Sequence, residues 1–260
     1  MTELSPRDPV LEMHGISKTY GAVRALRGVS FSLYRAEVVG LVGDNGAGKS
    51  TLSKVISGIT KPDAGEILIE GVPHVFEGAN DARAAGIETV FQNLAVVPTL
   101  DMPANMYLGR ERFKGGFLGR FLKIMDRASM YRSAEEGFHK LGLKLPDLGT
   151  KVGALSGGQR QAVAIARAVL WGSKIVVLDE PTAALGVHQT EMVLSFIEKL
   201  RDHGVTVVFI SHNMQNVMRV ADRVIVMRLG QKTFEGETGT LSPSRLVALI
   251  TGASEVDVHV

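Results

Sequence analysis

A glycine-rich segment near the N-terminus has the residue types and spacing of a loop that grips phosphate groups. Eight consecutive residues fit the pattern G-x-x-x-x-G-K-[ST], namely Gly43, Asp44, Asn45, Gly46, Ala47, Gly48, Lys49 and Ser50. Residues 38–42 before it have the β-branched, apolar character of a buried strand, and residues 49–59 after it that of a helix, which is the context the motif requires. Glycines let backbone N–H groups turn inward around phosphates, and the helix start adds its positive dipole end.

The residues that close this loop have side chains suited to a nucleoside triphosphate and its metal ion. We expect Lys49 to reach the β- and γ-phosphates and Ser50 to offer a hydroxyl to Mg²⁺, while Thr51 can donate to the α-phosphate. The sequence therefore predicts a site for Mg-ATP. The alternative, a glycine-rich turn that only caps a helix, is disfavoured because the strand and the helix are both present.

A second segment, residues 174–180, is an apolar run that ends in the adjacent carboxylates Asp179 and Glu180. Alternate residues of a strand face opposite ways, which predicts different tasks for the two side chains. Asp179 suits the Mg²⁺ shell, directly or through a water. Glu180 suits a general base that polarises the water attacking the γ-phosphate. Without the phosphate loop, an acidic strand end would more often be a solvated loop.

A third segment predicts another anion site at a helix start. Ser156 caps a helical pattern, and the glycines that follow leave backbone N–H groups free. The four residues of this segment are Ser156, Gly157, Gly158 and Gln159. Because the chain has two phosphate-binding helix starts but one nucleotide loop, we infer a ligand shared between the two.

The elements that must position these residues indicate an α/β fold. Short apolar runs alternate with longer helical patterns, which favours a mainly parallel sheet. The runs that predict buried strands are residues 38–42, 175–178, 205–210 and 224–227. Residues 11–14, 29–34 and 66–70 predict an N-terminal antiparallel β subdomain. Residues 94–155 lack strand-like runs and predict an inserted α-helical subdomain. It includes a helix at 127–141 whose apolar residues are spaced for one face, namely Met130, Ala134, Phe138 and Leu141. We thus expect one domain over 1–260: an α/β core at 1–93 and 156–235, the helical subdomain at 94–155, and a C-terminal helix and tail at 236–260.

Composition excludes several classes of protein. The 260 residues carry a net charge of +2, which gives no electrostatic case for nucleic-acid binding. Cysteine is absent, so disulfides and thiolate metal sites are impossible. We expect no signal peptide and no membrane span, since the apolar runs are far shorter than a bilayer requires. Any role at a membrane must come through a partner.

Residues 155–159, LSGGQ, resemble the signature motif of ATP-binding-cassette ATPases, and the resemblance covers nearly the whole chain. It implies a P-loop nucleotide triphosphatase core and a head-to-tail homodimer in which each signature closes on the ATP held by the other copy. It also implies roles for three further residues. Tyr20 matches the aromatic residue that stacks on adenine, Gln92 the glutamine that contacts Mg²⁺ and the attacking water, and His212 the histidine that contacts the γ-phosphate.

One segment departs from the family pattern. After Pro181 and Thr182 the family usually has Ser-Ala-Leu-Asp, and its aspartate joins the two sites of the dimer. Here the run is Ala183, Ala184, Leu185 and Gly186, so the carboxylate is missing. The contact by which the two sites of the dimer communicate is therefore expected to differ from that of the family.

Residues 86–94, 105–111 and 183–187 resemble the ATPase subunits of bacterial monosaccharide importers, and the single cassette is similar to fructose-type members. This implies uptake of a simple sugar, fructose- or ribose-type, through membrane permease subunits that dock on the helical region. It also implies a periplasmic sugar-binding protein and a peripheral location at the cytoplasmic face of the inner membrane. The receptor and the permease, and not this subunit, would set sugar specificity.

Three other functions stay open at this point. The first is a transporter ATPase for another cargo, such as an amino acid or a lipid. The second is a soluble cassette that remodels DNA or ribosomes, although such chains generally carry coiled coils, zinc modules or a second cassette. The third is a regulatory module that binds ATP and dimerises without turnover, which the missing aspartate favours.

Overall fold

The structure, a computed structural model, describes residues 8–116, 121–143 and 146–253. Its centre is a six-stranded sheet in the order β10-β9-β3-β8-β7-β6. Every strand is parallel to its neighbours except β10, which pairs with β9 antiparallel. The strands are β3 (Val38–Gly43), β6 (Ile87–Val90), β7 (Ile175–Asp179), β8 (Thr206–Ile210), β9 (Arg223–Arg228) and β10 (Gln231–Glu237). The predicted α/β fold with a mainly parallel sheet is confirmed.

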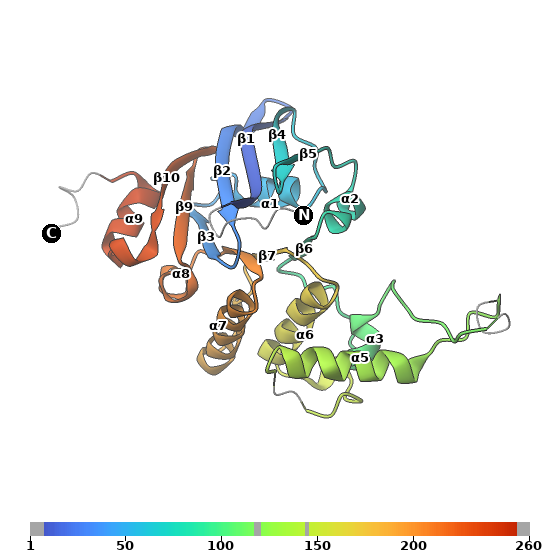
Figure 1. The fold of residues 1–260 in the computed structure, drawn as a ribbon. Coiled ribbons are helices and arrows are strands. Elements are labelled where there is room, and N and C mark those ends of the chain that lie inside the picture. Colours follow the sequence, from blue (N-terminus) through green and yellow to red (C-terminus); the bar gives the residue numbers. More distant parts are fainter. Residues whose placement is uncertain (1–7, 117–120, 144–145, 254–260) are drawn as a thin grey trace.

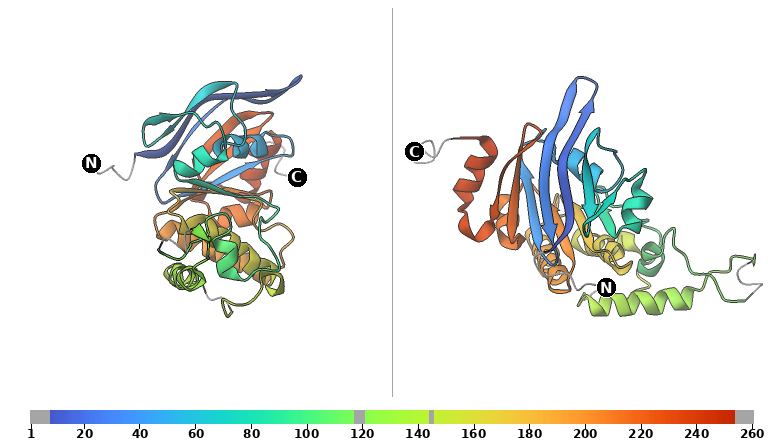
Figure 2. Two further views of the ribbon diagram at one scale, coloured as in Figure 1. Left: turned by 90° about the vertical axis from the view of Figure 1, so that its right-hand side faces the viewer. Right: turned by 45° about the horizontal axis from the view of Figure 1, so that its top comes forward.

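A second, four-stranded antiparallel sheet covers one face of this sheet (Figure 2). Its order is β2-β1-β4-β5, with β1 (Pro9–Tyr20), β2 (Val23–Tyr34), β4 (Ala64–Ile69) and β5 (Val72–His74). The predicted N-terminal antiparallel subdomain is therefore confirmed, although its first two strands are each 12 residues long and extend beyond the predicted segments. Between the two sheets lies α1 (Lys49–Ile56), which ends three residues before its predicted end.

The central sheet separates two hydrophobic cores, because its buried strands are apolar on both faces. Along β7, Ile175 and Val177 belong to the core shared with the antiparallel sheet and α1. Val176 and Leu178 belong to the opposite core, which the helices cover. This alternation is the two-residue period of a strand that is buried on both sides.

The helices on that second face fall into two groups (Figure 1). Helices α7 (Val187–Asp202) and α8 (Met214–Val220) lie beneath the sheet in Figure 1, and α9 (Pro243–Thr251) lies beside β9 and packs against α8. Helices α3 (Met102–Met106) and α5 (Arg127–Lys140) lie to the side, and α6 (Gly157–Leu170) packs against α3 and α5 as well as against α7. On α5 the predicted inward face is confirmed, since its apolar residues are buried: Met130, Ala134, Phe138 and the following Leu141. A further short helix, α2 (Ala79–Ala84), precedes β6.

The predicted end of the core at residue 235 is wrong, because it falls inside β10. That strand pairs with β9 from Gln231 to Glu237. It is a partly exposed edge strand with mostly polar residues, so it lacks the apolar run by which its buried neighbours are recognised.

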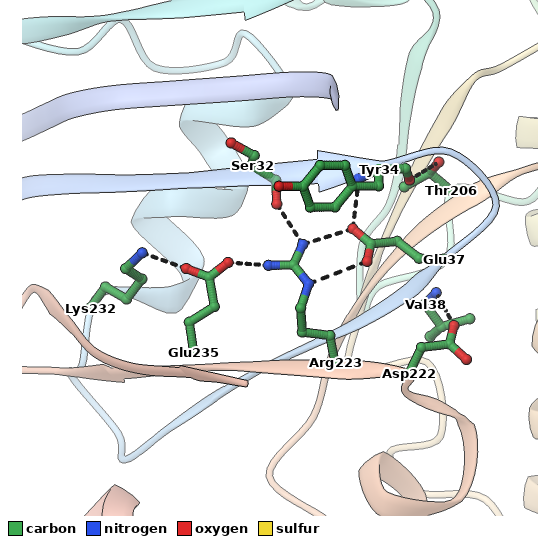
Figure 3. Close-up of polar contacts among 9 residues, drawn as sticks. All are labelled: Ser32, Tyr34, Glu37, Val38, Thr206, Asp222, Arg223, Lys232 and Glu235. Atoms are coloured by element: carbon green, nitrogen blue, oxygen red, sulfur yellow. Dashed lines mark hydrogen bonds and ion pairs between the residues drawn. The ribbon is translucent and has the colours of Figure 1, made fainter. Parts of the chain in front are cut away.

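A group of charged side chains ties β9 and β10 to the antiparallel sheet (Figure 3). The Arg223 guanidinium lies between two carboxylates and donates to Glu37 Oε1 at 2.8 Å and to Glu235. It also donates to the Ser32 carbonyl at 2.6 Å and lies 5.2 Å from the centre of the Tyr34 ring. The side chain of Arg223 is only 14% exposed, and it is the cation that pairs with Glu37, while Glu235 also pairs with Lys232.

Replacing Arg223 should therefore cost far more stability than replacing an exposed arginine. We expect Arg223→Met to lower the free energy of unfolding by about 3–5 kcal/mol, because it leaves the largely buried Glu37 carboxylate without a cation, while Glu235 keeps only Lys232. Arg35→Met is the matched control: Arg35 pairs with Glu70 but is 42% exposed, and such a pair contributes about 1 kcal/mol or less. Urea denaturation of both variants measures the difference, and equal losses would contradict this account.

Candidate functional site

The topology brings four sequence motifs to one edge of the central sheet. Strands β3, β8, β7 and β6 are adjacent and parallel, so their carboxyl ends meet along the same edge. The glycine-rich loop follows β3, Glu180 follows β7, His212 lies two residues after β8, and Gln92 lies two residues after β6. Open α/β sheets bind their ligands at the carboxyl ends of the strands, so this edge is the candidate binding site.

The loop after β3 has a backbone that only glycine can follow at two of its positions. Gly43 has φ 153°, and a Cβ there would lie 2.3 Å from the Met227 carbonyl oxygen. Gly48 has φ 104°, and a Cβ there would lie 2.7 Å from the Ala25 carbonyl oxygen. Gly48 also precedes α1, whose first turn has no side-chain cap, so its N–H groups can bind an anion.

The Lys49 amine lies within the curl of this loop. Its Nζ donates to the carbonyl oxygens of Gly43 at 2.7 Å and of Asp44 at 3.0 Å. Burial lowers the pKa of Lys49, against the opposing effect of Glu180, Asp44 and Asp179. The amine is thus only partly hydrated and surrounded by oxygen atoms, and a phosphate would give it a fully charged partner.

The carboxylates after β7 take up different surroundings. Burial raises the pKa of Asp179, and the charge of Glu180 raises it further, while Lys49 and Lys54 oppose the change. A carboxylate with its charge disfavoured in this way gains from a nearby cation. Asp179 is the last residue of β7, and Glu180 follows the strand with a left-handed backbone, φ 52°. The two side chains therefore diverge because of this left-handed residue, and not because of the strand alternation that the sequence predicted.

Glu180 and His212 form a hydrogen-bonded pair. Glu180 Oε1 accepts from the backbone N–H of His212 at 3.0 Å and lies 2.8 Å from His212 Nδ1. The side chain of Glu180 is 16% exposed and that of His212 73% exposed, so the carboxylate lies behind the imidazole at the edge of an open hollow. The left-handed backbone of Glu180 costs on the order of 1–3 kcal/mol, and such strained residues cluster at active sites and ligand-binding sites.

The predicted second anion site is an N-terminal capping box. Ser156 Oγ accepts from the backbone N–H of Gln159 at 3.3 Å, and Gln159 Oε1 accepts from the backbone N–H of Ser156 at 2.9 Å. A Cβ on Gly157 would lie 2.8 Å from Leu185 Cδ2, and one on Gly158 would lie 2.8 Å from Met192 Cε. The two glycines therefore also allow α6 to approach α7 closely. In the described part of the chain, no hydrogen bond joins this segment to the phosphate loop.

The other predicted site residues make few contacts. Tyr20 ends β1, is 46% exposed, and places its hydroxyl 3.5 Å from Thr60 Oγ1. Gln92 and Ser50 are exposed, and Thr51 is half-buried on α1. Ser50, Gln92 and Asp179 carry oxygen atoms, which are the ligands that Mg²⁺ prefers. These residues would fit Mg²⁺ if phosphate oxygens supplied its other ligands. No cluster of three acidic or histidine side chains exists within the described residues, so the protein alone does not supply such a shell.

Gly186, at the position of the missing aspartate, begins α7 as its N-cap without a side-chain hydrogen bond. It has φ −69° and ψ 165°, and a Cβ there would meet no atom within 4 Å. An aspartate therefore fits without strain. The sequence pattern showed that a carboxylate was absent, but not that the position caps a helix.

The substitution Gly186→Asp should consequently leave the fold intact and stabilise it slightly. The new carboxylate can accept from the first-turn N–H groups of α7 and face the positive end of its dipole, which we expect to add a few tenths to about 1 kcal/mol. Gly186→Ala adds the same Cβ without an acceptor and is the control. Chemical denaturation should rank aspartate above alanine, and the reverse order would refute the cap.

Sequence reasoning also missed a cluster of charged side chains beside β6. Glu88 accepts from Arg110 at 2.8 Å and lies 3.4 Å from Arg83. The Arg110 guanidinium stacks 5.0 Å from the centre of the Trp171 ring. These side chains and Arg167 line a small groove between β6, α6 and the segment after α3. Its residues are far apart in sequence, so only the fold brings them together.

Comparison with known proteins agrees with this geometry. Residues 26–183, more than half of the chain, match the ABC transporter family. The chain is 47% identical to the fructose import ATP-binding protein FrcA of Rhizobium meliloti, over 96% of each protein. It is 44% identical to the ribose import ATP-binding protein RbsA 1 of Burkholderia cenocepacia, covering 95% of this chain but 47% of that protein.

A solved dimeric ATP-binding cassette in a post-hydrolysis state, bound to ADP and Pi, superposes with a TM-score of 0.71 at 27% identity. The alignment covers 88% of this chain and 98% of that one. In the described residues, no helix is long and apolar enough to cross a membrane. With the phosphate loop, the paired carboxylates and the capping box in place, the chain belongs to the ABC transporter family as one of its ATP-binding cassettes.

Proposed function

We propose that this chain is the ATP-hydrolysing subunit of an importer for a simple sugar of the fructose or ribose type. It acts at the cytoplasmic face of the inner membrane as a head-to-tail homodimer, with membrane permease subunits and a periplasmic sugar-binding protein. The observation that carries hydrolysis is the hydrogen-bonded pair of Glu180 and His212 at the sheet edge that holds the phosphate loop. The likeness to the fructose and ribose import proteins supports the cargo.

The chain's own residues divide the work of binding and hydrolysis. Tyr20 stacks on adenine, and the loop from Gly43 to Ser50 surrounds the phosphates while Lys49 exchanges its two carbonyl partners for phosphate oxygens. Thr51 donates to the α-phosphate. Mg²⁺, when bound through Ser50, Gln92 and Asp179, neutralises charge on the phosphate oxygens.

Glu180 is the proposed general base. Its carboxylate accepts a proton from the water that attacks the γ-phosphorus, and the P–O bond to the β-phosphate breaks as the new one forms. His212 holds the Glu180 carboxylate through two contacts and contacts the γ-phosphate from the exposed side of the pair. Gln92 orients the attacking water.

Dimer closure supplies the coupling to transport. ATP contacts the loop of one copy and the residues Ser156 to Gln159 of the other only when the dimer is closed, so ATP binding shifts the equilibrium toward that state. Hydrolysis removes the shared contacts and releases the dimer. The helical subdomain, which carries the segment after α3, then moves with the docked permease.

The groove beside β6 is the proposed seat of a permease helix. It lies between the strand that leads to Gln92 and the segment 107–110 of the helical subdomain. Three arginines and one glutamate line it, which suits an acidic side chain on the partner. A permease helix in this groove contacts both the α/β core and the helical subdomain, which move relative to each other in the proposed cycle.

Two measurements test this function. Purified protein should release phosphate from Mg-ATP, and a strain lacking the gene should fail to grow on one member of a panel containing fructose, ribose and xylose. A chain that binds ATP without releasing phosphate would instead be a regulatory module. Turnover combined with normal growth on every sugar would indicate another cargo.

A further inference from the structure

A projecting arm joins α3 to α5, and no part of the proposed catalytic site uses it. We define the arm as residues 111–116 and 121–126, which extend beyond the end of α5 (Figures 1 and 2). Its two sides are joined at the base, where the Lys114 N–H donates to the Ile124 carbonyl at 2.8 Å and the Asp126 N–H to the Arg112 carbonyl at 2.7 Å. Phe113 and Met125 pair as an isolated β-bridge.

The arm exposes an unusual concentration of large apolar side chains. Their exposed fractions range from 43% to 75%, and the residues are Phe113, Phe121, Leu122, Ile124 and Met125. Single exposed apolar residues are ordinary on a protein surface, whereas a group of five on one short segment marks an interaction site.

The acidic side chains of the arm are hydrogen-bonded at its base, whereas its two lysines are exposed and, among the described residues, unpaired. Both acidic side chains are bound to backbone N–H groups at the base, since Glu111 accepts from Gly109 at 3.0 Å and Asp126 accepts from Ser129 at 3.1 Å. Lys114 and Lys123 are exposed, and neither has a carboxylate within ion-pair distance in the described part of the chain. The arm therefore presents apolar side chains together with unpaired positive charge.

We propose that this arm inserts its apolar side chains into the surface of an anionic lipid bilayer. Phenylalanine, leucine and isoleucine beside lysine are the residues of segments that lie at a membrane interface, where the apolar groups enter the acyl boundary and the amines meet anionic headgroups. A fluid lipid surface accommodates such a projecting, convex group of side chains without a matching pocket.

The position of the arm agrees with that partner. The arm begins one residue after Arg110, which lines the groove proposed to receive a permease helix. A segment that starts at the seat of a membrane protein lies near the bilayer. The inference therefore rests on the proposed function for its location, but the chemistry of the arm can be tested on the isolated chain.

The test is co-sedimentation of the purified full-length chain with phosphatidylcholine vesicles, with and without phosphatidylglycerol. We expect binding only to the anionic vesicles, and weaker binding at high salt. Replacing both amines, in Lys114→Gln with Lys123→Gln, should weaken it roughly tenfold or more, since each amine near an anionic surface contributes about 1 kcal/mol. Leu122→Ser with Ile124→Ser should weaken it as well.

Matched controls carry the same changes elsewhere. Lys61→Gln with Lys140→Gln removes the same charge, and Val72→Ser with Val75→Ser removes exposed apolar side chains from β5 and the residue that follows it, outside the arm. Equal binding by arm and control variants would overturn the proposal. The proposal would also be overturned if the arm variants bound vesicles normally but failed to co-purify with the permease in detergent. That result would show that the arm contacts a protein and not lipid. Phosphate release and growth on sugars report on the proposed function separately.

Discussion

Glu180→Gln is expected to reduce steady-state ATP hydrolysis by about 10²–10⁴-fold while ATP binding is retained, because the variant loses the proposed general base but none of the proposed phosphate contacts. The amide oxygen of glutamine can still accept the His212 backbone N–H that Glu180 Oε1 accepts at 3.0 Å, so the loop after β7 keeps its shape. In the proposed cycle ATP closes the dimer and hydrolysis releases it, so the variant should accumulate as a nucleotide-bound dimer.

Phosphate release and size-exclusion chromatography with Mg-ATP measure these two effects. Glu191→Gln is the matched control, because Glu191 lines the same hollow but pairs with Arg219 and is given no role in hydrolysis. It should hydrolyse ATP like the unaltered protein. A Glu180→Gln variant with an unchanged rate of phosphate release would rule out Glu180 as the base.

The second large effect is expected from Ser156→Glu. It introduces a carboxylate at the helix start that is proposed to close on the γ-phosphate of the partner copy, and such a like-charge contact costs several kcal/mol. We expect ATP-dependent dimerisation to weaken by about 100-fold or more and turnover to fall with it. Binding of ATP to a single copy, which uses the loop after β3, should be unchanged.

The control for Ser156→Glu is the same substitution at another serine cap. Ser242 caps α9 and accepts from the Arg245 N–H at 3.1 Å, as Ser156 accepts from Gln159 in α6. Ser242→Glu thus removes a comparable cap far from the sheet edge, and it should dimerise normally with ATP. If both variants lose dimerisation equally, loss of helix stability and not charge at the shared site explains the result.

Local sequence was sufficient for those parts of the fold whose signal is periodic. The buried strands β3, β7, β8 and β9 each show an apolar run, and α5 shows one apolar face, so their positions followed from residue pattern alone. The partly exposed strands gave a weaker pattern. β10, with the sequence QKTFEGE, was divided by the predicted boundary for that reason.

Long-range contacts could not be predicted from the sequence. The ion pair of Arg223 with Glu37 joins residues 186 positions apart, and Arg110 meets Glu88 and Trp171 only through the packing of α6 on β6. The left-handed backbone of Glu180 was also hidden, since non-glycine residues rarely adopt it and no local pattern announces it. The candidate site was predicted as a set of residues, and the structure adds the contact between Glu180 and His212.

We propose that each ATP lies between the phosphate loop of one copy and the capped helix start of the other. The decisive experiment is an experimental structure of Glu180→Gln in complex with Mg-ATP. We expect a closed pair in which the partner's Ser156 lies within hydrogen-bond distance of the γ-phosphate held by Lys49. A closed, ATP-loaded pair in which Ser156 lies far from both nucleotides would show that ATP is not shared between the two copies.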